Sequence, residues 1–236
     1  MNCVTQFKSF LIKAILTTDQ PDISIVYEDD TLLVLDKPSG LLSVPGRGQD
    51  KQDCLSSRVQ KRYPDASIVH RLDMGTSGLM LMARNAVAQR MLNEAFARRL
   101  VKKRYEAVVE GVAAPLATDP DDIWQEINLP IALDWPNRPL RVIDLVLGKP
   151  SQTSWQVMSV DLASGTSRLR LEPLTGRSHQ LRVHLMAIHH PILGDQLYAS
   201  ASVAAKSDRL LLHATTLELT HPVSHQCMLF VSATPF

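Results

Sequence analysis

The sequence predicts an α+β fold with a mainly antiparallel, mixed sheet and flanking helices. Segments with strand periodicity and segments with helical periodicity follow one another without the regular strand–helix–strand rhythm of a doubly wound sheet. The chain has 236 residues, 45% of them hydrophobic, which is enough to bury a sizeable core. No linker divides it convincingly, so we expect one domain over residues 23–236, preceded by an N-terminal extension over residues 1–22.

The first half of the chain predicts a hairpin, a loop and two helices with a buried strand between them. Residues 24–37 contain two apolar runs joined by a tight acidic turn, which is typical of a hairpin. Residues 38–50 are rich in Pro and Gly and predict a loop, whereas residues 54–63 have helical spacing. The apolar run at 79–83 suits a buried strand, and Asn85 can cap the helix that follows it.

Two segments in the second half alternate with a period of two residues and predict strands. Residues 104–112 place Tyr105 and every second residue after it on one face. In residues 167–173, leucines alternate with arginines in the same way. Helical spacing resumes after Ser178 and predicts a helix that ends before Pro191.

The composition excludes several classes of protein. The chain is too apolar and too balanced in charge to be disordered, and no run approaches the roughly 18 apolar residues of a membrane helix. The apolar segment Phe10–Leu16 is interrupted by Lys13 and has no small-residue cleavage site after it, which favours a short amphipathic helix over a signal peptide. Three cysteines without a CxxC pair are typical of a reduced, cytoplasmic protein.

Charge is distributed unevenly although the formal net charge is only +1. Residues 84–104 contain seven basic residues and one acidic residue, and the next thirty residues contain seven acidic residues and no Lys or Arg. Residues 166–190 contain four arginines and one acidic residue. The two basic segments could form one patch that follows a phosphate backbone, or they could be ordinary solvated faces, and the pattern alone leaves both interpretations open.

Several familiar signatures are missing from the sequence. Gly46 and Gly48 lack the third glycine of a dinucleotide fingerprint, and no HExxH or GxSxG motif occurs. His179 and His184 lie five residues apart, which places them on poorly aligned helix faces, and no acidic or thiol ligand is nearby in the sequence. We therefore expect no metal site, and a zinc hydrolase is a weak alternative.

The segment Val69–Ala83 carries the clearest indication of chemistry. The tetrad His-Arg-Leu-Asp precedes a Gly/Thr/Ser loop and then a buried strand, so Asp73 lies at a loop edge where a nucleophile or base can meet a ligand. A carboxylate that stays ionised in a dry pocket needs a positive partner, for which Arg177 is a candidate. On spacing alone, a turn residue at Asp73 and a surface charge at Arg177 remain equally open interpretations.

Four ordered blocks extend this signal over residues 26–222. They are YEDDTLLVLDKPSGLLSVPG, HRLDMGTSGLMLMA, KKRYEAVVEG and LTGRSHQLRVHLMAIHHPILGD, the last followed by LLLHATTLELTHP. In these blocks the chain resembles the RluA family of RNA pseudouridine synthases. Two further motifs, DWPNRP and GKPSQT, are most similar to the dual-specificity branch of that family, which acts on large-subunit (23S) ribosomal RNA and on tRNA anticodon stem-loops.

The resemblance implies a pseudouridine synthase fold with a central active-site cleft, and an isomerase that needs no cofactor and no metal. It implies that Asp73 is the catalytic aspartate, which attacks or assists at the target uridine so that the glycosidic bond breaks and the uracil rejoins through C5. Tyr105 would pack on the uracil ring and take the C5 proton. Arg177 would pair with Asp73. The target uridine must first leave the RNA stack, at a cost of a few kcal/mol.

The resemblance also implies contacts with RNA outside the reacting atoms. Arg71 would enter the RNA stack where the target base has left, because a planar guanidinium can stack on bases and bind phosphate. Leu181 would form an apolar wall of the pocket, and Arg182 would contact RNA. Aromatic residues make up only 5% of the chain, so we expect selection to come largely from RNA shape and phosphates.

The remaining expectations concern the domain organisation of the chain, its location and an alternative function. Residues 1–22 are too few for the S4-type RNA-binding domain that the family often carries, so recognition would rest on the catalytic domain over residues 23–236. We expect a cytoplasmic monomer with no membrane partner. The rival from another class is a non-catalytic RNA-binding protein or RNA chaperone on the same fold, which the intact set of Asp73, Tyr105 and Arg177 disfavours.

Overall fold

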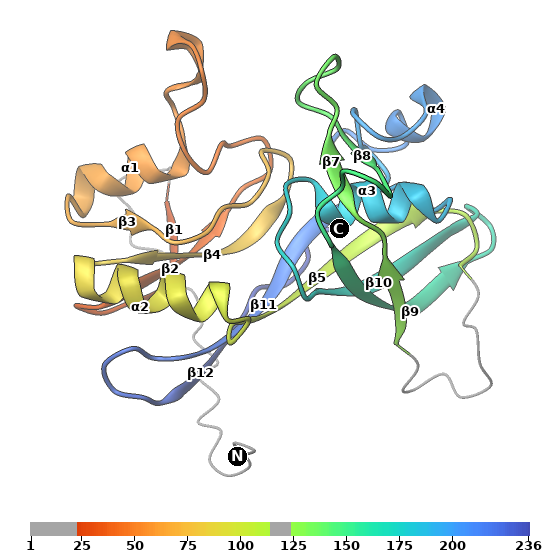
Figure 1. Ribbon diagram of the computed structural model, residues 1–236. Coiled ribbons are helices and arrows are strands. Elements are labelled where there is room, and N and C mark those ends of the chain that lie inside the picture. Colours follow the sequence, from red (N-terminus) through yellow and green to blue (C-terminus); the bar gives the residue numbers. More distant parts are fainter. Residues whose placement is uncertain (1–22, 114–123) are drawn as a thin grey trace. The chain divides into compact units, whose positions relative to one another are not determined.

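The structure, a computed structural model, describes residues 23–113 and 124–236 (Figure 1). Its chain divides into two compact units. The first unit comprises the chain up to Lys103 together with Ala214–Ala233, and the second comprises Arg104–His213 and Thr234–Phe236. The expected N-terminal extension and its amphipathic helix lie outside the described residues.

The first unit is built on strands in the order β1-β2-β4-β11, with β3 on β4 and β12 on β11. The strands are β1 (Ser24–Glu28), β2 (Leu32–Lys37), β3 (Ser67–Ile68), β4 (Ser77–Ala83), β11 (Leu212–Thr220, the first two residues of which belong to the second unit) and β12 (Cys227–Val231). Every described register in this unit is antiparallel. β1 and β2 form the predicted hairpin, in which Ser24 pairs with Asp36.

Two helices of the first unit begin where the sequence predicts. Cys54 caps α1 (Leu55–Arg62) by accepting the Ser57 N–H on its sulfur, and η1 (Gln49–Lys51) is a short 3-10 turn before it. Asn85 caps α2 (Ala86–Ala97) through its side-chain oxygen, which accepts the Ala88 N–H at 2.8 Å. As its amphipathic spacing predicts, α2 packs against β4 (Figure 1).

The core of the first unit lies between β4, α2 and the neighbouring strands. All seven residues of β4 are buried, which agrees with the prediction of a buried strand at 79–83. The cluster comprises Leu32, Val34, Leu79, Leu81, Ala83, Ala88, Leu92, Val101, Leu217, Leu219 and Phe230. Within β4, Gly78 has φ +106°, and a Cβ there would lie 2.3 Å from the Ala214 carbonyl oxygen, so only glycine allows β11 this close approach.

The second unit has strands in the order β5-β10-β9-β6, and all its described registers are antiparallel. They are β5 (Lys102–Glu110, the first two residues of which belong to the first unit), β6 (Gln125–Asn128), β9 (Gln152–Asp161) and β10 (Thr166–Pro173). A separate hairpin pairs β7 (Ile131–Leu133) with β8 (Arg141–Ile143). The helices are α3 (Gln180–Ala187) and α4 (Ala201–Ala204).

The period-two prediction holds in this unit, because alternate residues of β5 and β10 are buried and the arginines of β10 lie on the other face. The predicted helix after Ser178 is α3, which ends before Pro191. Antiparallel sheets with a few helices confirm the α+β class. Over residues 23–113 and 124–236, none of the helices has the length and apolar character that crossing a membrane requires.

Candidate active site

Asp73 lies in the first unit, in the irregular segment between β3 and β4. Its carbonyl oxygen accepts the Thr76 N–H at 3.1 Å, which closes a tight turn just before the buried strand. The side chain of Asp73 is partly buried, Arg71 is exposed and Leu72 is buried. The segment therefore presents Arg71 to solvent and anchors itself through Leu72.

A buried lysine holds the residue that follows Asp73. Lys37, at the end of β2, is fully buried, and its ammonium donates to the carbonyl oxygens of Pro38 at 2.9 Å, Leu41 at 2.7 Å and Met74 at 3.1 Å. A buried cation is costly unless hydrogen bonds replace its hydration, and these carbonyls supply them. Lys37 thus joins the loop after β2 to the loop of Asp73.

The loop after β2 makes further hydrogen bonds to both sides of Asp73. The Ser43 hydroxyl donates to the Leu72 carbonyl at 2.7 Å and accepts the Leu72 N–H at 3.0 Å. On the other side, the Ser39 hydroxyl donates to the Gly75 carbonyl at 2.7 Å, and the Gly40 N–H donates to the Met74 carbonyl at 2.9 Å. The backbone before and after Asp73 is therefore fixed, which is how a catalytic carboxylate is pre-organised.

His70 fixes the start of the same segment. Its Nε2 accepts the Leu81 N–H at 2.8 Å, so the ring proton is on Nδ1, and the ring stacks on Phe96 at a centroid distance of 4.7 Å. Burial lowers the pKa of His70 to about 3, and the charge of Lys103 adds to the effect. His70 is thus a neutral, structural acceptor that ties the Asp73 segment to β4 and α2.

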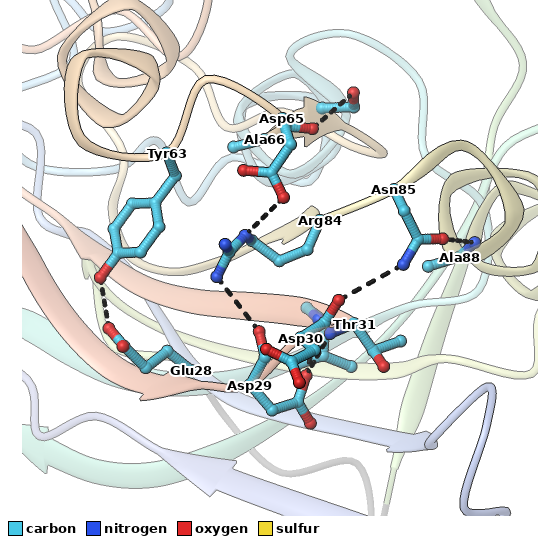
Figure 2. Close-up of polar contacts among 12 residues, drawn as sticks. Glu28, Asp29, Asp30, Thr31, Tyr63, Asp65, Ala66, Arg84, Asn85 and Ala88 are labelled. Carbon is cyan, nitrogen blue, oxygen red and sulfur yellow. Dashed lines mark hydrogen bonds and ion pairs between the residues drawn. The ribbon is translucent and has the colours of Figure 1, made fainter.

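Figure 2 shows the polar contacts around Arg84, the first residue of the basic segment. Arg84 donates to the Asp65 carboxylate at 2.9 Å and to the Asp29 carbonyl oxygen at 3.3 Å. Beside it, Tyr63 donates to the Glu28 carboxylate, and the guanidinium of Arg84 lies 4.7 Å from the centre of the Tyr63 ring. Arg84 is therefore occupied within the first unit, where it secures the acidic turn between β1 and β2.

Three of the other six basic residues in this segment also have acidic partners inside their own unit. Ion pairs join Arg98 to Glu94, Lys102 to Glu218 and Arg104 to Glu172, at distances of 3.1, 3.3 and 3.1 Å. Lys103 is partly buried above the Phe96 ring, and burial lowers its pKa. Arg90 and Arg99 are exposed. Three of these cations are therefore paired with carboxylates, and a joint patch of the two basic segments stays a prediction.

Tyr105, Arg177, Leu181 and Arg182 lie in the second unit. Tyr105 is in β5, opposite Leu171 of β10, and is buried. Leu181 is buried in the first turn of α3. The predicted pairing of Arg177 with Asp73 and the predicted pocket wall at Leu181 stay predictions.

Gln180 organises the loop that carries Arg177. Its side-chain oxygen accepts the Thr175 hydroxyl at 2.7 Å and the Arg177 N–H at 3.0 Å, and its nitrogen donates to Gln152 and Thr153 at 2.9 and 3.0 Å. The Arg177 guanidinium is exposed and donates to the Pro150 carbonyl oxygen at 3.3 Å. The backbone of Arg177 is thus fixed while its charge remains accessible to solvent.

Arg182 has a different environment from the RNA contact predicted for it. Its guanidinium donates in a bidentate arrangement to Asp195, with distances of 2.8 and 2.6 Å, and both side chains are buried. The guanidinium carbon also lies 5.0 Å from the centre of the Tyr198 ring. These contacts give Arg182 a role in securing α3 to the segment around residues 195–198, and its contact with RNA stays a prediction.

Two histidines of this unit, His184 and His190, have structural partners. His184 is fully buried between the Thr153 hydroxyl and the Leu129 carbonyl oxygen, each at 2.9 Å, and burial lowers its pKa. His190 Nδ1 lies 2.9 Å from the carbonyl oxygen of Glu110. Within residues 23–113 and 124–236, no group of three or more His, Cys, Asp or Glu side chains could hold a metal ion.

Sequence reasoning did not identify Lys37, Ser43, His70 and Gln180 as supports of the site. Each is a polar residue that is buried or partly buried and bonded to backbone, and hydrophobic periodicity carries no signal for such a position. Their presence within the matched blocks was the only available indication.

Comparison with known proteins identifies the family of the chain. A family model described as RNA pseudouridylate synthase matches residues 31–187. The chain is 45% identical over 217 residues to the dual-specificity RNA pseudouridine synthase RluA of Escherichia coli (strain K12), covering 92% of this chain and 95% of that relative. It is 48% identical over 208 residues to the protein of the same name from Vibrio parahaemolyticus, covering 87% and 80%.

Two solved structures are also similar. Human RNA pseudouridylate synthase domain containing 1 matches with a TM-score of 0.72 at 30% identity, covering 91% of this chain and 84% of that one. Human RNA pseudouridylate synthase domain containing 4 matches with a TM-score of 0.66 at 25% identity, covering 89% and 88%. These matches show that the chain belongs to the RNA pseudouridylate synthase family and is an isomerase that acts on RNA.

Proposed function

We propose that this chain converts specific uridines to pseudouridine in large-subunit ribosomal RNA and in tRNA anticodon stem-loops, with Asp73 as the catalytic carboxylate. The observation that carries the assignment of Asp73 is the set of hydrogen bonds from Lys37, Ser39 and Ser43 to the residues on either side of it. Two RNA targets are supported by the name of the bacterial relatives, dual-specificity RNA pseudouridine synthase.

The reaction begins with extrusion of the target base. Reaching C1′ or C6 of a uridine in folded RNA requires that the base leave the stack, which costs a few kcal/mol. The exposed guanidinium of Arg71, two residues before Asp73, enters the vacated position and offsets part of that cost by stacking and by binding phosphate.

Asp73 then acts at the extruded nucleotide, either by attack or by assistance, so that the bond between N1 and C1′ breaks. The uracil turns, a bond forms between C5 and C1′, the C5 proton is lost and N1 gains a proton. Tyr105 packs on the flat face of the uracil and takes the C5 proton. Leu181 closes the apolar side of the pocket, and Arg177 pairs with the Asp73 carboxylate so that the anion is stabilised.

The organisation of the protein follows from the same proposal. Residues 23–236 form the catalytic domain and carry the recognition of RNA. The protein works as a monomer in the cytoplasm, where its RNA substrates are. The proposed reaction rearranges one nucleotide without a change in oxidation state, so it involves no redox cofactor.

The experiment is tritium release from RNA transcripts labelled at uracil C5. The wild-type protein should release tritium from ribosomal or tRNA transcripts, whereas Asp73→Asn should release none above background. Asp208→Asn, which alters an exposed carboxylate, is the matched control and should behave like the wild type. RNA binding without release by the wild type on any transcript would instead support the non-catalytic RNA-binding protein or chaperone.

A further inference from the structure

The β7–β8 hairpin carries an exposed tryptophan at its turn. Leu133 pairs with Arg141, so residues 134–140 connect the two strands, and Trp135 within them is 65% exposed. By contrast, Trp155 is buried in the second unit. An exposed indole gives up the large gain of burial, and tryptophan is enriched where an apolar ring has a binding partner.

The turn is held in one conformation by local hydrogen bonds. The Asp134 carboxylate accepts the backbone N–H of Asn137 at 3.2 Å and its side-chain amide at 3.0 Å. The Asp134 N–H donates to the Leu140 carbonyl at 3.1 Å, and the Leu140 N–H donates to the Asn137 carbonyl at 3.0 Å. Ordering of this turn would therefore add little entropy cost when a ligand binds to Trp135.

An arginine lies against the exposed ring. The guanidinium carbon of Arg138 is 4.7 Å from the centre of the Trp135 ring, and Arg138 Nε donates to the Trp135 carbonyl at 3.1 Å. The only acidic side chain of the turn, Asp134, is engaged by Asn137. The turn thus presents a flat aromatic surface next to a cation, which are the two groups that bind a nucleobase and its phosphate.

The hairpin is joined to the helix that carries two of the candidate site residues. The Arg141 N–H donates to the Tyr198 hydroxyl at 2.9 Å, and that hydroxyl lies 2.6 Å from Nδ1 of His179, the residue that precedes α3. β8 also packs against α3 within the second unit (Figure 1). The turn therefore has a defined position relative to Leu181 and Arg182.

We propose that residues 134–139 form a second RNA-contact site, in which Trp135 stacks on an unpaired base and Arg138 binds a neighbouring phosphate. The inference rests on the proposed function, because it takes RNA as the substrate. RNA is favoured over a protein partner because a single ring beside a cation suits a base and a phosphate. A protein interface would need a wider apolar patch.

The test measures the affinity and turnover of the RNA transcript that the wild type modifies fastest. Trp135→Ala should raise Kd and KM by about 5- to 150-fold, the range expected for loss of one base-stacking contact. The value of kcat at saturating RNA should stay within about two-fold of wild type, since the site binds RNA outside the reacting atoms. Trp135→Phe should retain most of the affinity.

Variants at Arg138 and at a control position test the phosphate contact separately from the stacking of Trp135. Arg138→Ala should weaken binding and reduce the slope of log K against log salt by about 0.7 to 0.9, the contribution of one phosphate contact. Val146→Ser is the control, because Val146 is also an exposed apolar residue but lies in the loop beyond the far end of β8. Its affinity should equal that of the wild type.

The outcomes distinguish this inference from the proposed function. If the wild type releases tritium and Trp135→Ala binds and turns over RNA like the wild type, the second RNA-contact site is wrong and the proposed function stands. The same conclusion follows if Trp135→Ala changes only the self-association of the protein. If the wild type releases no tritium from any transcript, the proposed function itself fails. Circular dichroism and thermal melting of each variant show that the fold is intact.

Discussion

Replacing Ser43 by alanine removes a single oxygen atom from the support of the Asp73 segment. Ser43 is buried, and its hydroxyl both donates to the Leu72 carbonyl at 2.7 Å and accepts the Leu72 N–H at 3.0 Å. The variant leaves two buried backbone groups without these partners, and each such loss costs about 1–3 kcal/mol. Since the change in side-chain volume is small, these two losses dominate, and we expect the free energy of unfolding to fall by roughly 2–6 kcal/mol.

The same substitution should slow the reaction. Leu72 directly precedes Asp73, and a displacement of a catalytic group by about 1 Å can cost roughly 100-fold in rate. We expect kcat for tritium release to fall by about 10- to 100-fold, at a temperature where the variant remains folded. Urea unfolding followed by circular dichroism measures the stability, and Ser224→Ala, at an exposed position of the same unit, is the control. Wild-type stability together with wild-type kcat in Ser43→Ala would refute the argument that this loop positions the aspartate.

Three further predictions follow from the geometry. The pKa of His70 is about 3 in the folded protein and about 6.5 in the unfolded chain, so its contribution to stability is complete above pH 6.5 and is lost as pH falls toward 3, by at most about 1.4 kcal/mol per pH unit. Urea midpoints measured between pH 7 and 4.5 should therefore fall more steeply for wild type than for His70→Gln, and parallel curves would contradict this. Arg71→Ala should reduce turnover of structured RNA while its thermal melt matches wild type, because Arg71 is exposed, and full activity would remove its role in base extrusion. Arg182→Ala should lose about 3–5 kcal/mol of stability, because Asp195 stays buried without its bidentate partner. Arg177→Ala should have the melting temperature of the wild type and a lower kcat, and the reverse pattern would exchange the roles of the two arginines.

Hairpin, helix and strand positions could be predicted because their signals are local. Asn85 lies directly before its helix, and the leucines of β10 alternate within a few residues, so pattern and structure involve the same short stretch of chain. The loop of Asp73 could be located for the same reason, since a buried strand follows it.

The supports of the site could not be predicted because their partners are distant in the sequence. Lys37 is the last residue of an apolar strand and could equally have been exposed, and only the fold brings the Met74 carbonyl to it. The ion pairs of the basic segment could not be predicted for a related reason. Lys102 and Arg104 belong to that segment, and each pairs with an acidic residue from a much later part of the chain.

The most direct test of the central claim is the amount of pseudouridine formed in a transcript. Nucleosides from a digested ribosomal or tRNA transcript, incubated with wild type, Asp73→Asn or Asp208→Asn, can be quantified by liquid chromatography and mass spectrometry. We predict up to one pseudouridine per target site with the wild type and with Asp208→Asn, and none with Asp73→Asn. Equal conversion by Asp73→Asn and the wild type would contradict the assignment of Asp73 as the catalytic carboxylate.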